Sequence, residues 1–223
     1  MPPLKALVFD AYGTLFDVQS VGVLADSFFP GKGAALALAW RSKQLEYSWL
    51  RSLMLNYEDF ATVTRSGLQA ACRILDLPLD AARTADLMAA YDTLLVYPDA
   101  RAALPRLARF KLSILSNGSP AMLGAVVRNA GLNGTFSAVI SVDEARTYKP
   151  SPAVYQLAPD RLGLSRSEIG FVSSNYWDAA GAKHFGFTVF WINRSGAPPD
   201  DLDSRPDMVL GNLGELAARL DGQ

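Results

Sequence analysis

LKALVFDAYGTLFD, residues 4–17, is the stretch that decides the fold. A short apolar run, residues 4–9, ends at Asp10, and Gly13 and Thr14 follow as turn signals. This order predicts a strand that runs into a tight loop, so Asp10 lies at the carboxyl end of a strand, where open α/β sheets build their active sites. A carboxylate is already ionised at neutral pH and can act as a nucleophile, forming an ester or acyl-phosphate intermediate. Asp10 could equally cap a turn or a helix, and the rest of the chain must decide.

The composition is that of a globular protein with one large domain, or with a core and an inserted subdomain. Half of the 223 residues are hydrophobic, which is enough to bury a sizeable core. With 21 basic and 22 acidic residues, the net charge of −1 does not favour nucleic acid or an anionic membrane as a partner. Cys72 is the single cysteine, which excludes an internal disulfide and a thiolate metal cluster. We expect a cytoplasmic protein, because the sequence shows neither a signal core nor a membrane span.

The segment directly after this opening stretch has the periodicity of helices. Leu, Ala, Arg and Met recur at helical spacing, and the breaks fall at Pro, Gly and Asn residues. The predicted helices span residues 21–28, 33–55, 59–75 and 80–95. We interpret this segment as a helical cap that is inserted just beyond Asp10.

From residue 98 onward, strands alternate with helices. The predicted strands span residues 111–116, 137–141, 169–173, 188–192 and 207–210, and the predicted helices span residues 120–130, 151–162 and 177–185, with one more at the end of the chain. Such alternation predicts an α/β fold whose core is a doubly wound, parallel, Rossmann-like sheet with helices on both faces. We therefore expect a discontinuous core domain, residues 1–15 and 98–223, and an inserted cap subdomain, residues 16–97.

Polar side chains follow several of the predicted strands at the point where each strand ends. They are Asp10 and Thr14 after the first strand, Ser116 and Asn117 after the second, Lys149 after the third, and Ser173, Asn175 and Asp178 after the fourth. Residues 116–118 could simply cap the next helix, and Lys149 could simply solubilise a loop. Because the ends of parallel strands meet in one crevice, we expect these hydroxyl, amide, ammonium and carboxylate groups to converge there.

This arrangement resembles the haloacid dehalogenase superfamily. In that superfamily a nucleophilic Asp ends the first strand, Ser or Thr ends the second, a Lys precedes the helix of the third motif, and acidic residues follow the fourth strand. The resemblance covers nearly the whole chain and includes a helical cap in the usual place. Most members are Mg²⁺-dependent phosphatases, so the resemblance alone does not identify the reaction.

Two positions depart from the phosphatase pattern. Phosphatases of the superfamily usually carry a second Asp two residues after the nucleophile, as the acid for the leaving alcohol, and here that position is Tyr12. A phenol with a pKa near 10 is poorly matched to this proton transfer at neutral pH. The last motif usually begins with Gly-Asp and supplies carboxylates to Mg²⁺, but residues 173–174 are Ser-Ser. Both departures suit a halide leaving group, which needs no proton.

The pattern is most similar to the type II (S)-2-haloacid dehalogenases, which match in five separate motifs. These motifs are residues 10–17, 40–51, 116–118, 148–150 and 173–178. The resemblance implies that a short (S)-2-haloalkanoate is hydrolysed to an (R)-2-hydroxyalkanoate and halide through an ester on Asp10, with inversion. It further implies no cofactor, no metal ion and a homodimer.

The resemblance also assigns roles to single residues. Lys149 neutralises and orients Asp10, Thr14 fixes Asp10 by a hydrogen bond, and Tyr155 supports the lysine. Asp178, with Ser173 and Asn175, positions or deprotonates the hydrolytic water. The resemblance assigns the halide to Arg41, Asn117, Phe60 and Trp177, with Leu45 on the same helical face as Arg41. It assigns the substrate carboxylate to Ser116, Tyr12 and backbone N–H groups, and Ala11 is also among the binding residues.

Two competing functions remain open from the sequence. The first is a Mg²⁺-dependent small-molecule phosphatase of the same superfamily, which would show turnover that is sensitive to EDTA. The second is a catalytically silent binding protein, although such a protein has no physical need for an Asp10–Lys149 pair at a strand end. The only histidine, His184, falls in the helix after the fourth strand, so we interpret it as structural and not as part of a Ser-His-Asp triad.

Overall fold

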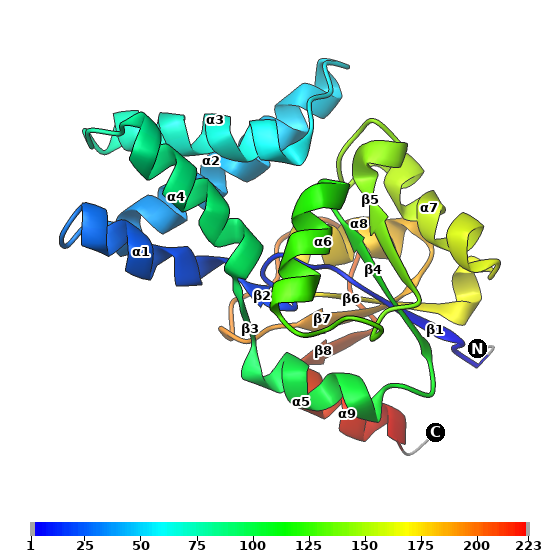
Figure 1. Cartoon of the computed structure of the whole chain (residues 1–223). Coiled ribbons are helices and arrows are strands. Elements are labelled where there is room, and N and C mark those ends of the chain that lie inside the picture. The colour runs from blue at the N-terminus through cyan, green and yellow to red at the C-terminus, as the bar shows by residue number, and fades with distance from the viewer. Residues whose placement is uncertain (1–2, 222–223) are drawn as a thin grey trace.

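The computed structural model describes residues 3–221, and a six-stranded sheet forms its centre. The strands lie in the order β5-β4-β1-β6-β7-β8, and every neighbouring pair is parallel (Figure 1). Their bounds are β1 (Ala6–Phe9), β4 (Lys111–Ser116), β5 (Ala138–Ser141), β6 (Ile169–Ser173), β7 (Thr188–Ile192) and β8 (Met208–Leu210). The predicted doubly wound parallel sheet is confirmed. β1 lies in its interior, which explains why all four of its residues are apolar and buried.

Helices cover both faces of this sheet. They are α5 (Pro98–Arg106), α6 (Pro120–Asn129), α7 (Pro152–Leu162), α8 (Tyr176–Phe185) and α9 (Leu213–Asp221). α5 packs against α9, and α7 packs against α8 on the opposite face, as right-handed crossovers require (Figure 1). The sequence interpretation missed α5, which begins with Pro98 at its first position and carries Asp99 in its first turn.

The four helices after β1 stand apart from the sheet in Figure 1 and pack mainly on one another. Their bounds are α1 (Val21–Phe28), α2 (Gly33–Leu53), α3 (Phe60–Ile74) and α4 (Ala81–Ala90). The side chains of Asp59 and Asp80 cap α3 and α4 by accepting backbone N–H bonds at 2.7 and 2.8 Å. α4 ends five residues earlier than predicted, because the chain passes through a 3-10 turn, Tyr91–Thr93, into a short strand.

That strand, β3 (Leu95–Val96), pairs antiparallel with β2 (Phe16–Asp17). Phe16 lies opposite Val96, and Asp17 lies opposite Leu95, so the chain leaves the sheet and returns to it at the same place. Neither strand was predicted, because two residues are too few to show an alternating pattern. We propose that this ladder marks the boundary between the core, residues 1–15 and 98–223, and the cap, residues 16–97.

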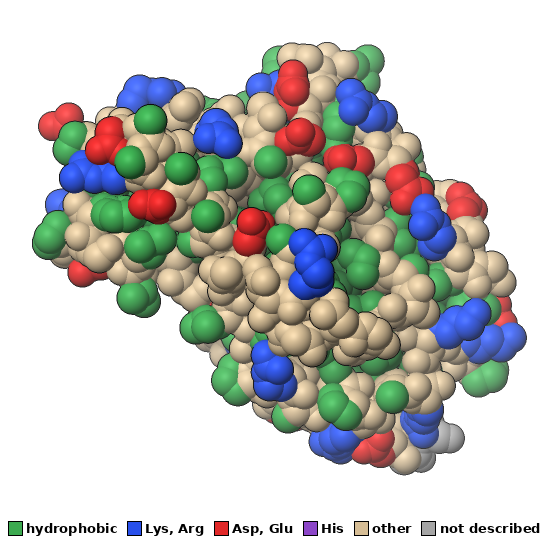
Figure 2. Space-filling view, in the orientation of Figure 1, with side chains coloured by type: hydrophobic (Ala, Val, Ile, Leu, Met, Phe, Trp, Pro, Cys, Tyr) green, Lys and Arg blue, Asp and Glu red, His purple; other side chains and the backbone are tan. Residues whose placement is uncertain are grey.

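The face of the molecule that Figure 2 shows carries no large region of a single charge. In Figure 2, Lys and Arg side chains are interspersed with Asp and Glu over the visible face, in keeping with a net charge of −1. Across residues 3–221, none of the helices combines the length and the hydropathy that a membrane span needs.

Candidate active site

Asp10 follows the last residue of β1, and its carboxylate is the centre of a hydrogen-bonded cluster. Lys149 Nζ lies 3.1 Å from one carboxylate oxygen. Thr14 Oγ1 and Asn175 Nδ2 donate to the other oxygen at 3.1 and 2.9 Å. These donors come from three segments far apart in the sequence, and together they hold the carboxylate of Asp10 in one orientation. The predicted convergence of the strand ends is therefore present at this residue.

The loop after Asp10 is shaped so that Thr14 returns to it. The carbonyl oxygen of Ala11 accepts the N–H groups of Thr14, Leu15 and Phe16 at 3.3, 2.9 and 3.0 Å, which closes a tight turn. Gly13 has a φ of +92°, a conformation that a residue with a side chain rarely adopts. The turn thus depends on this glycine and places the hydroxyl of Thr14 next to the carboxylate four residues before it.

Lys149 is a buried cation between two carboxylates. Its side chain is 1% exposed, and its Nζ lies 3.1 Å from Asp10 and 2.9 Å from Asp178. The ring of Phe171 lies below the ammonium, with its centroid 4.9 Å away. The backbone N–H of Lys149 donates to Asn117 Oδ1 at 3.1 Å, so Asn117 contributes to the placement of the lysine. An unpaired buried ammonium would be costly, and the two carboxylates remove that cost.

Asp178 lies in the first turn of α8 and is fully buried. Burial raises the pKa of its carboxyl from 3.8 to about 6, with the charge of Asp10 adding to the rise and Lys149 opposing it. The hydroxyl of Tyr155 donates to the side chain of Asp178 at 2.8 Å and lies 3.1 Å from its backbone oxygen. The expectation for Tyr155 is thereby corrected: it supports Asp178 directly, and it reaches Lys149 only through that carboxylate.

Ser116 ends β4 and Asn117 follows it, as expected, but neither caps the next helix. Ser116 Oγ accepts the N–H of Gly118 at 3.2 Å, and the cap of α6 is Ser119, whose Oγ accepts the N–H of Met122 at 3.4 Å. A methyl group on Gly118 would lie 2.8 Å from the ring of Tyr12, so the glycine permits this close approach. Ser116 is fully buried beside the loop that carries Tyr12.

A side chain that follows β6 binds the carboxylate of Asp10 directly. Ser173 Oγ accepts the N–H of Asn175 at 3.1 Å, which forms a side-chain turn. Asn175 Nδ2 then donates to Asp10 and to the carbonyl of Tyr12, at 2.9 and 3.2 Å. Asn175 thus holds the carboxylate of Asp10 with its side chain, while its backbone carbonyl accepts the N–H of Asp178 at 3.1 Å.

Two cap helices bring further side chains over the loop after β1. Arg41, on α2, donates to the carbonyl of Tyr12 at 3.2 Å and to Gln44 Oε1 at 2.7 Å. Phe60 begins α3, and its ring stacks on the ring of Tyr12 with centroids 5.6 Å apart. Leu45 lies one turn after Arg41 on the same helix and is half-buried. The cap therefore closes one side of the site with one cation and apolar groups.

The hydroxyl of Tyr12 has no hydrogen-bond partner among the described residues, although the side chain is buried. Burial raises the pKa of this phenol, and the nearby Tyr91 and Asp92 add to the rise. Tyr12 is therefore an uncharged donor at neutral pH and is not an acid for a leaving alcohol.

A cleft of about 590 Å³ leads to Lys149 between the core and the cap. Trp177 on α8 and Trp49 on α2 form one wall, with their rings in an edge-to-face contact at 5.4 Å. Leu53, the last residue of α2, and Leu55, just beyond it, also line the cleft. The cleft thus brings Trp177 and Lys149 to one surface, whereas Asp10, Tyr12 and Arg41 lie outside its lining.

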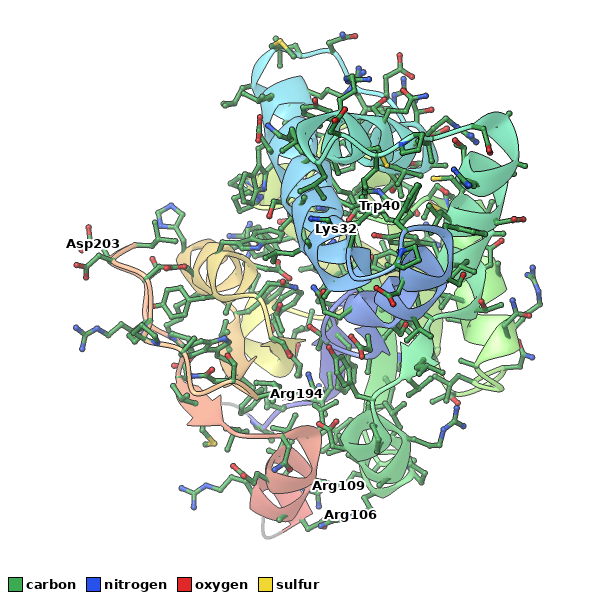
Figure 3. The ribbon with its side chains drawn as sticks, turned by 90° about the vertical axis from the view of Figure 1, so that its left-hand side faces the viewer. Lys32, Trp40, Arg106, Arg109, Arg194 and Asp203 are labelled. Carbon is green, nitrogen blue, oxygen red and sulfur yellow. The ribbon has the colours of Figure 1, made fainter. Side chains whose placement is uncertain are left out.

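Two residues that help to build the site were missed from the sequence. The first is Gln44, whose side-chain oxygen accepts a hydrogen bond from Arg41. The second is Arg194, which follows β7 and is labelled in Figure 3. Its guanidinium donates to Ser174 Oγ at 2.8 Å and to the carbonyl of Thr14 at 2.9 Å. Asp99 holds the guanidinium of Arg194 at 2.9 Å from the first turn of α5. Arg194 carries the same signal as Asp10, because it closely follows a strand of the parallel sheet, residues 188–192.

The side chains around Asp10 do not fit a Mg²⁺ ion. Asp178 is the other carboxylate that shares this cluster, and the ammonium of Lys149 lies between the two. Within residues 3–221, His, Cys, Asp and Glu side chains nowhere gather in a group of three or more that would hold a metal. Mg²⁺ prefers several oxygen ligands in octahedral order, and this arrangement offers an ammonium instead.

Comparisons with known proteins identify the family of the chain. A family model described as haloacid dehalogenase-like hydrolase matches residues 4–186. The chain is 47% identical over 215 residues to an (S)-2-haloacid dehalogenase of Pseudomonas sp. (strain YL), covering 96% of this chain and 93% of that one. It is 44% identical over 212 residues to haloacetate dehalogenase H-2 of Moraxella sp. (strain B), covering 94% and 95%. The structure of the L-2-haloacid dehalogenase from Xanthobacter autotrophicus with chloropropionic acid covalently bound superposes with a TM-score of 0.93, at 45% identity over 99% of both chains.

Proposed function

Because the chain belongs to the family of haloacid dehalogenase-like hydrolases, we infer that it is an (S)-2-haloacid dehalogenase. It hydrolyses short (S)-2-haloalkanoates to (R)-2-hydroxyalkanoates and halide. One observation carries this inference: Asp10 is clamped by Lys149, Thr14 and Asn175, while the position two residues later is a tyrosine with no acidic function. Such a site has the nucleophile but lacks the acid that phosphatases carry two residues after it, which suits a leaving group that needs no proton.

In the first step, a carboxylate oxygen of Asp10 attacks the carbon that bears the halogen. The new C–O bond forms as the C–X bond breaks, the halide leaves with the bonding electron pair, and the configuration at that carbon inverts. Lys149 keeps the carboxylate of Asp10 oriented. Arg41 uses some of its N–H groups to bind Tyr12 and Gln44, and its other N–H groups face the departing halide. Asn117, Phe60 and Trp177 complete the halide side of the site, and Ser116, Tyr12 and the backbone near Ala11 bind the substrate carboxylate.

In the second step, water attacks the carbonyl carbon of the Asp10 ester. Asp178 accepts one proton of this water and passes it to the departing 2-hydroxy oxygen, while Ser173 helps to shape the turn beside the site. The regenerated carboxyl of Asp10 loses the other proton to solvent, so each turnover releases one halide and one proton. Tyr155 holds Asp178 in place throughout.

The decisive experiment measures halide release from each enantiomer of 2-chloropropionate, with and without EDTA. We expect release from the (S) enantiomer alone, with the same rate when EDTA is present. Phosphate release from a phosphomonoester that EDTA abolishes would instead identify the Mg²⁺-dependent phosphatase. Asp10→Asn is the matched control, because it keeps the shape of the side chain and removes the nucleophile.

The ester itself is tested by single turnover in water labelled with ¹⁸O. The label enters the carboxylate of Asp10 first, because water attacks the carbonyl carbon of the ester and not the substrate carbon. Mass spectrometry of the peptide that contains Asp10 measures this uptake. Label found only in the product would exclude the covalent route.

The assembly state and location follow as proposals from two further observations. Exposed apolar side chains gather at the end of α2, where Leu53 is 81% exposed and Leu55 is 93% exposed. We propose that a second copy of the chain covers this surface in a homodimer, because exposed apolar clusters of this kind mark contact sites.

The single cysteine, Cys72, is unpaired and buried, which supports a cytoplasmic location.

A further inference from the structure

Two hydrogen bonds hold the side chain of Arg41 in one orientation. Its guanidinium donates to Gln44 Oε1 at 2.7 Å and to the carbonyl of Tyr12 at 3.2 Å. The bond to Tyr12 ties the arginine to the core, and the bond to Gln44 ties it to its own helix. With two N–H groups held in this way, the direction in which the rest of the fork points is fixed.

Gln44 is a fully buried polar side chain between α2 and α3. Its Nε2 donates to Thr64 Oγ1 at 2.7 Å, and Thr64 Oγ1 donates in turn to the carbonyl of Phe60 at 2.5 Å. Because the proton of the Thr64 hydroxyl is committed to Phe60, its oxygen must accept from Gln44. The amide of Gln44 therefore presents its NH₂ group to Thr64 and its oxygen to Arg41, and the reverse orientation would lose both bonds.

The contact between the two helices does not require this amide. Trp40, one residue before Arg41, already links α2 to α3 through its indole N–H, which donates to the carbonyl of Thr64 at 2.7 Å. An apolar side chain of the same length at position 44 would fill the space without the cost of burying an amide. The polar side chain of Gln44 meets the guanidinium of Arg41 on one side and also lies beside the phenol of Tyr91.

We propose that Gln44 is a positioning residue for the dehalogenation reaction, with Thr64 setting the direction of its amide. The proposal rests on the proposed function, because it assigns Arg41 to the departing halide. Gln44 touches neither substrate nor halide, and it acts by keeping the fork of Arg41 aimed at the place where negative charge develops.

The first test is Gln44→Met, which keeps the length of the side chain and removes the acceptor. We expect kcat/KM for (S)-2-chloropropionate to fall about 10- to 100-fold, as displacement of a catalytic group by about 1 Å does. The loss resides in kcat and is larger for the chloro than for the bromo substrate, because chloride is the poorer leaving group. Gln156→Met is the matched control, since Gln156 accepts a bond from Arg166 at 2.7 Å on the exposed surface, and we expect no change.

A pair of substitutions at Thr64 tests whether this residue orients the amide of Gln44, and it leaves Gln44 and Arg41 unchanged. Thr64→Val removes the hydroxyl at nearly the same volume, and we expect a loss in the same direction as that of Gln44→Met. Thr64→Ser retains the hydroxyl and restores activity to within about twofold of the wild type. This pair decides the matter if Gln44→Met does not fold, and equal activity of the Val and Ser variants would overturn the proposal.

A double-mutant cycle separates positioning from general support of the fold. If Gln44 acts through Arg41, the loss caused by Gln44→Met shrinks to less than threefold when Arg41→Lys is already present. Losses that multiply, or a folded Gln44→Met enzyme with wild-type kcat/KM and the same chloro-to-bromo ratio, would overturn the role of Gln44. Failure of the wild type to release halide from either enantiomer would instead overturn the proposed function.

Discussion

At the scale of single residues, one ammonium serves two carboxylates whose charges change at different steps. Lys149 lies between Asp10, which becomes an ester, and Asp178, which in the proposed mechanism handles the water. The charge of Asp10 contributes to the raised pKa of Asp178, after the larger effect of burial. Esterification removes that charge, so the pKa of Asp178 falls and its ionised form is favoured when a base is needed. The first half of the reaction thereby prepares the second.

This coupling predicts the pH dependence of ester hydrolysis. Asp178 must be ionised to accept a proton, and burial raises its pKa to about 6 before the ester forms. The rate constant of ester hydrolysis is therefore constant above that pH and falls about tenfold per unit below the pKa of Asp178, with a midpoint below about 6. Single-turnover measurements from pH 4.5 to 8 give this midpoint, and one clearly above 6 would contradict the coupling.

Replacement of the base predicts an accumulated intermediate. In Asp178→Asn, Thr14 and Asn175 still hold Asp10, so the attack on the substrate continues. Ester hydrolysis slows by about 10²- to 10⁴-fold, the usual contribution of a general base. Rapid-quench halide assays then show a burst close to one halide per active site. Asp160 is an exposed carboxylate on α7, and we expect no such burst in the control variant Asp160→Asn. A missing burst in Asp178→Asn would exclude this role for Asp178.

The residues of the site differ in how far the sequence could predict them. Asp10, Thr14, Lys149 and Asp178 each follow a strand of a parallel sheet, and the strand-end rule brings them together without a structure. Gln44 has no such signal, because its role depends on a contact with Thr64 on another helix. The partner of Tyr155 was likewise beyond the sequence, since helical spacing does not say which buried group a hydroxyl meets.

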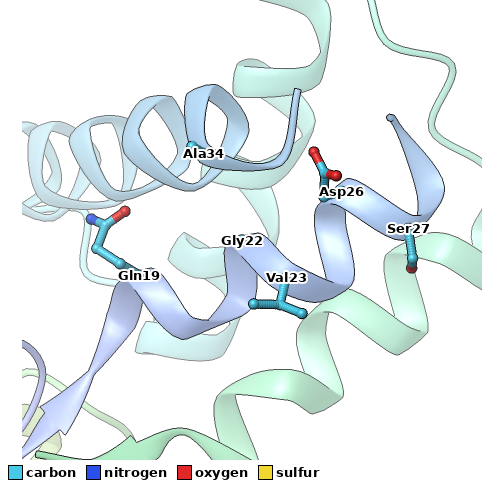
Figure 4. A pocket seen from close by; sticks show the side chains of 6 residues that line it. All are labelled: Gln19, Gly22, Val23, Asp26, Ser27 and Ala34. Atoms are coloured by element: carbon cyan, nitrogen blue, oxygen red, sulfur yellow. The ribbon is translucent and has the colours of Figure 1, made fainter. Parts of the chain in front are cut away.

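At the scale of elements, α1 and α2 approach so closely that a glycine is required. A methyl group on Gly33, the first residue of α2, would lie 2.2 Å from the carbonyl oxygen of Gly22 and 2.6 Å from Asp26 Cβ. Figure 4 shows the two helices at this crossing, where Gly22 and Ala34 border a surface pocket. The side chain of Asp26 accepts the N–H of Gly33 at 3.0 Å, which caps α2 from the neighbouring helix.

This contact predicts opposite effects for two substitutions of the same type. Gly33→Ala lowers the free energy of unfolding by about 1–3 kcal/mol, because the helices must separate. Gly22→Ala introduces a methyl group 3.5 Å from its nearest neighbour, an ordinary contact, and leaves stability the same or raises it by up to about 1 kcal/mol through helix propensity. Urea unfolding of the two variants measures the difference, and equal losses would refute the crossing geometry.

The elements that the sequence did not predict are those that depend on distant partners. β2 and β3 contain two residues each, and they are strands only because they pair with one another across the inserted helices. α5 carries a helix signal in its Pro98 and Asp99, but it is only nine residues long and lies at the boundary of the inserted segment. The long helices and the strands of the central sheet were predicted well, because their periodicity is internal to each segment.

At the scale of the whole molecule, the exposed end of α2 predicts how the chain assembles. Leu53→Glu places a charge in the proposed dimer contact, and we expect the protein to become a monomer. Light scattering after size-exclusion chromatography measures the mass in solution. Leu202→Glu is the control, because Leu202 is 50% exposed in the loop after β7 and lies outside the proposed contact. A wild type that is already monomeric would contradict the homodimer.

The paired strands β2 and β3 have a consequence for how this architecture diversifies. Because Phe16 lies opposite Val96, the two ends of the inserted segment are neighbours, and the core chain could be closed there by a short turn. A different insert with neighbouring ends would join the same two positions without shifting the register of the central sheet. The nucleophile and its ammonium belong to one part, and Arg41 and Phe60 belong to the other. Under the proposed division into core and cap, evolution or a protein engineer can therefore exchange the proposed substrate-selecting part as a single unit, while the part that carries Asp10 and Lys149 is inherited unchanged.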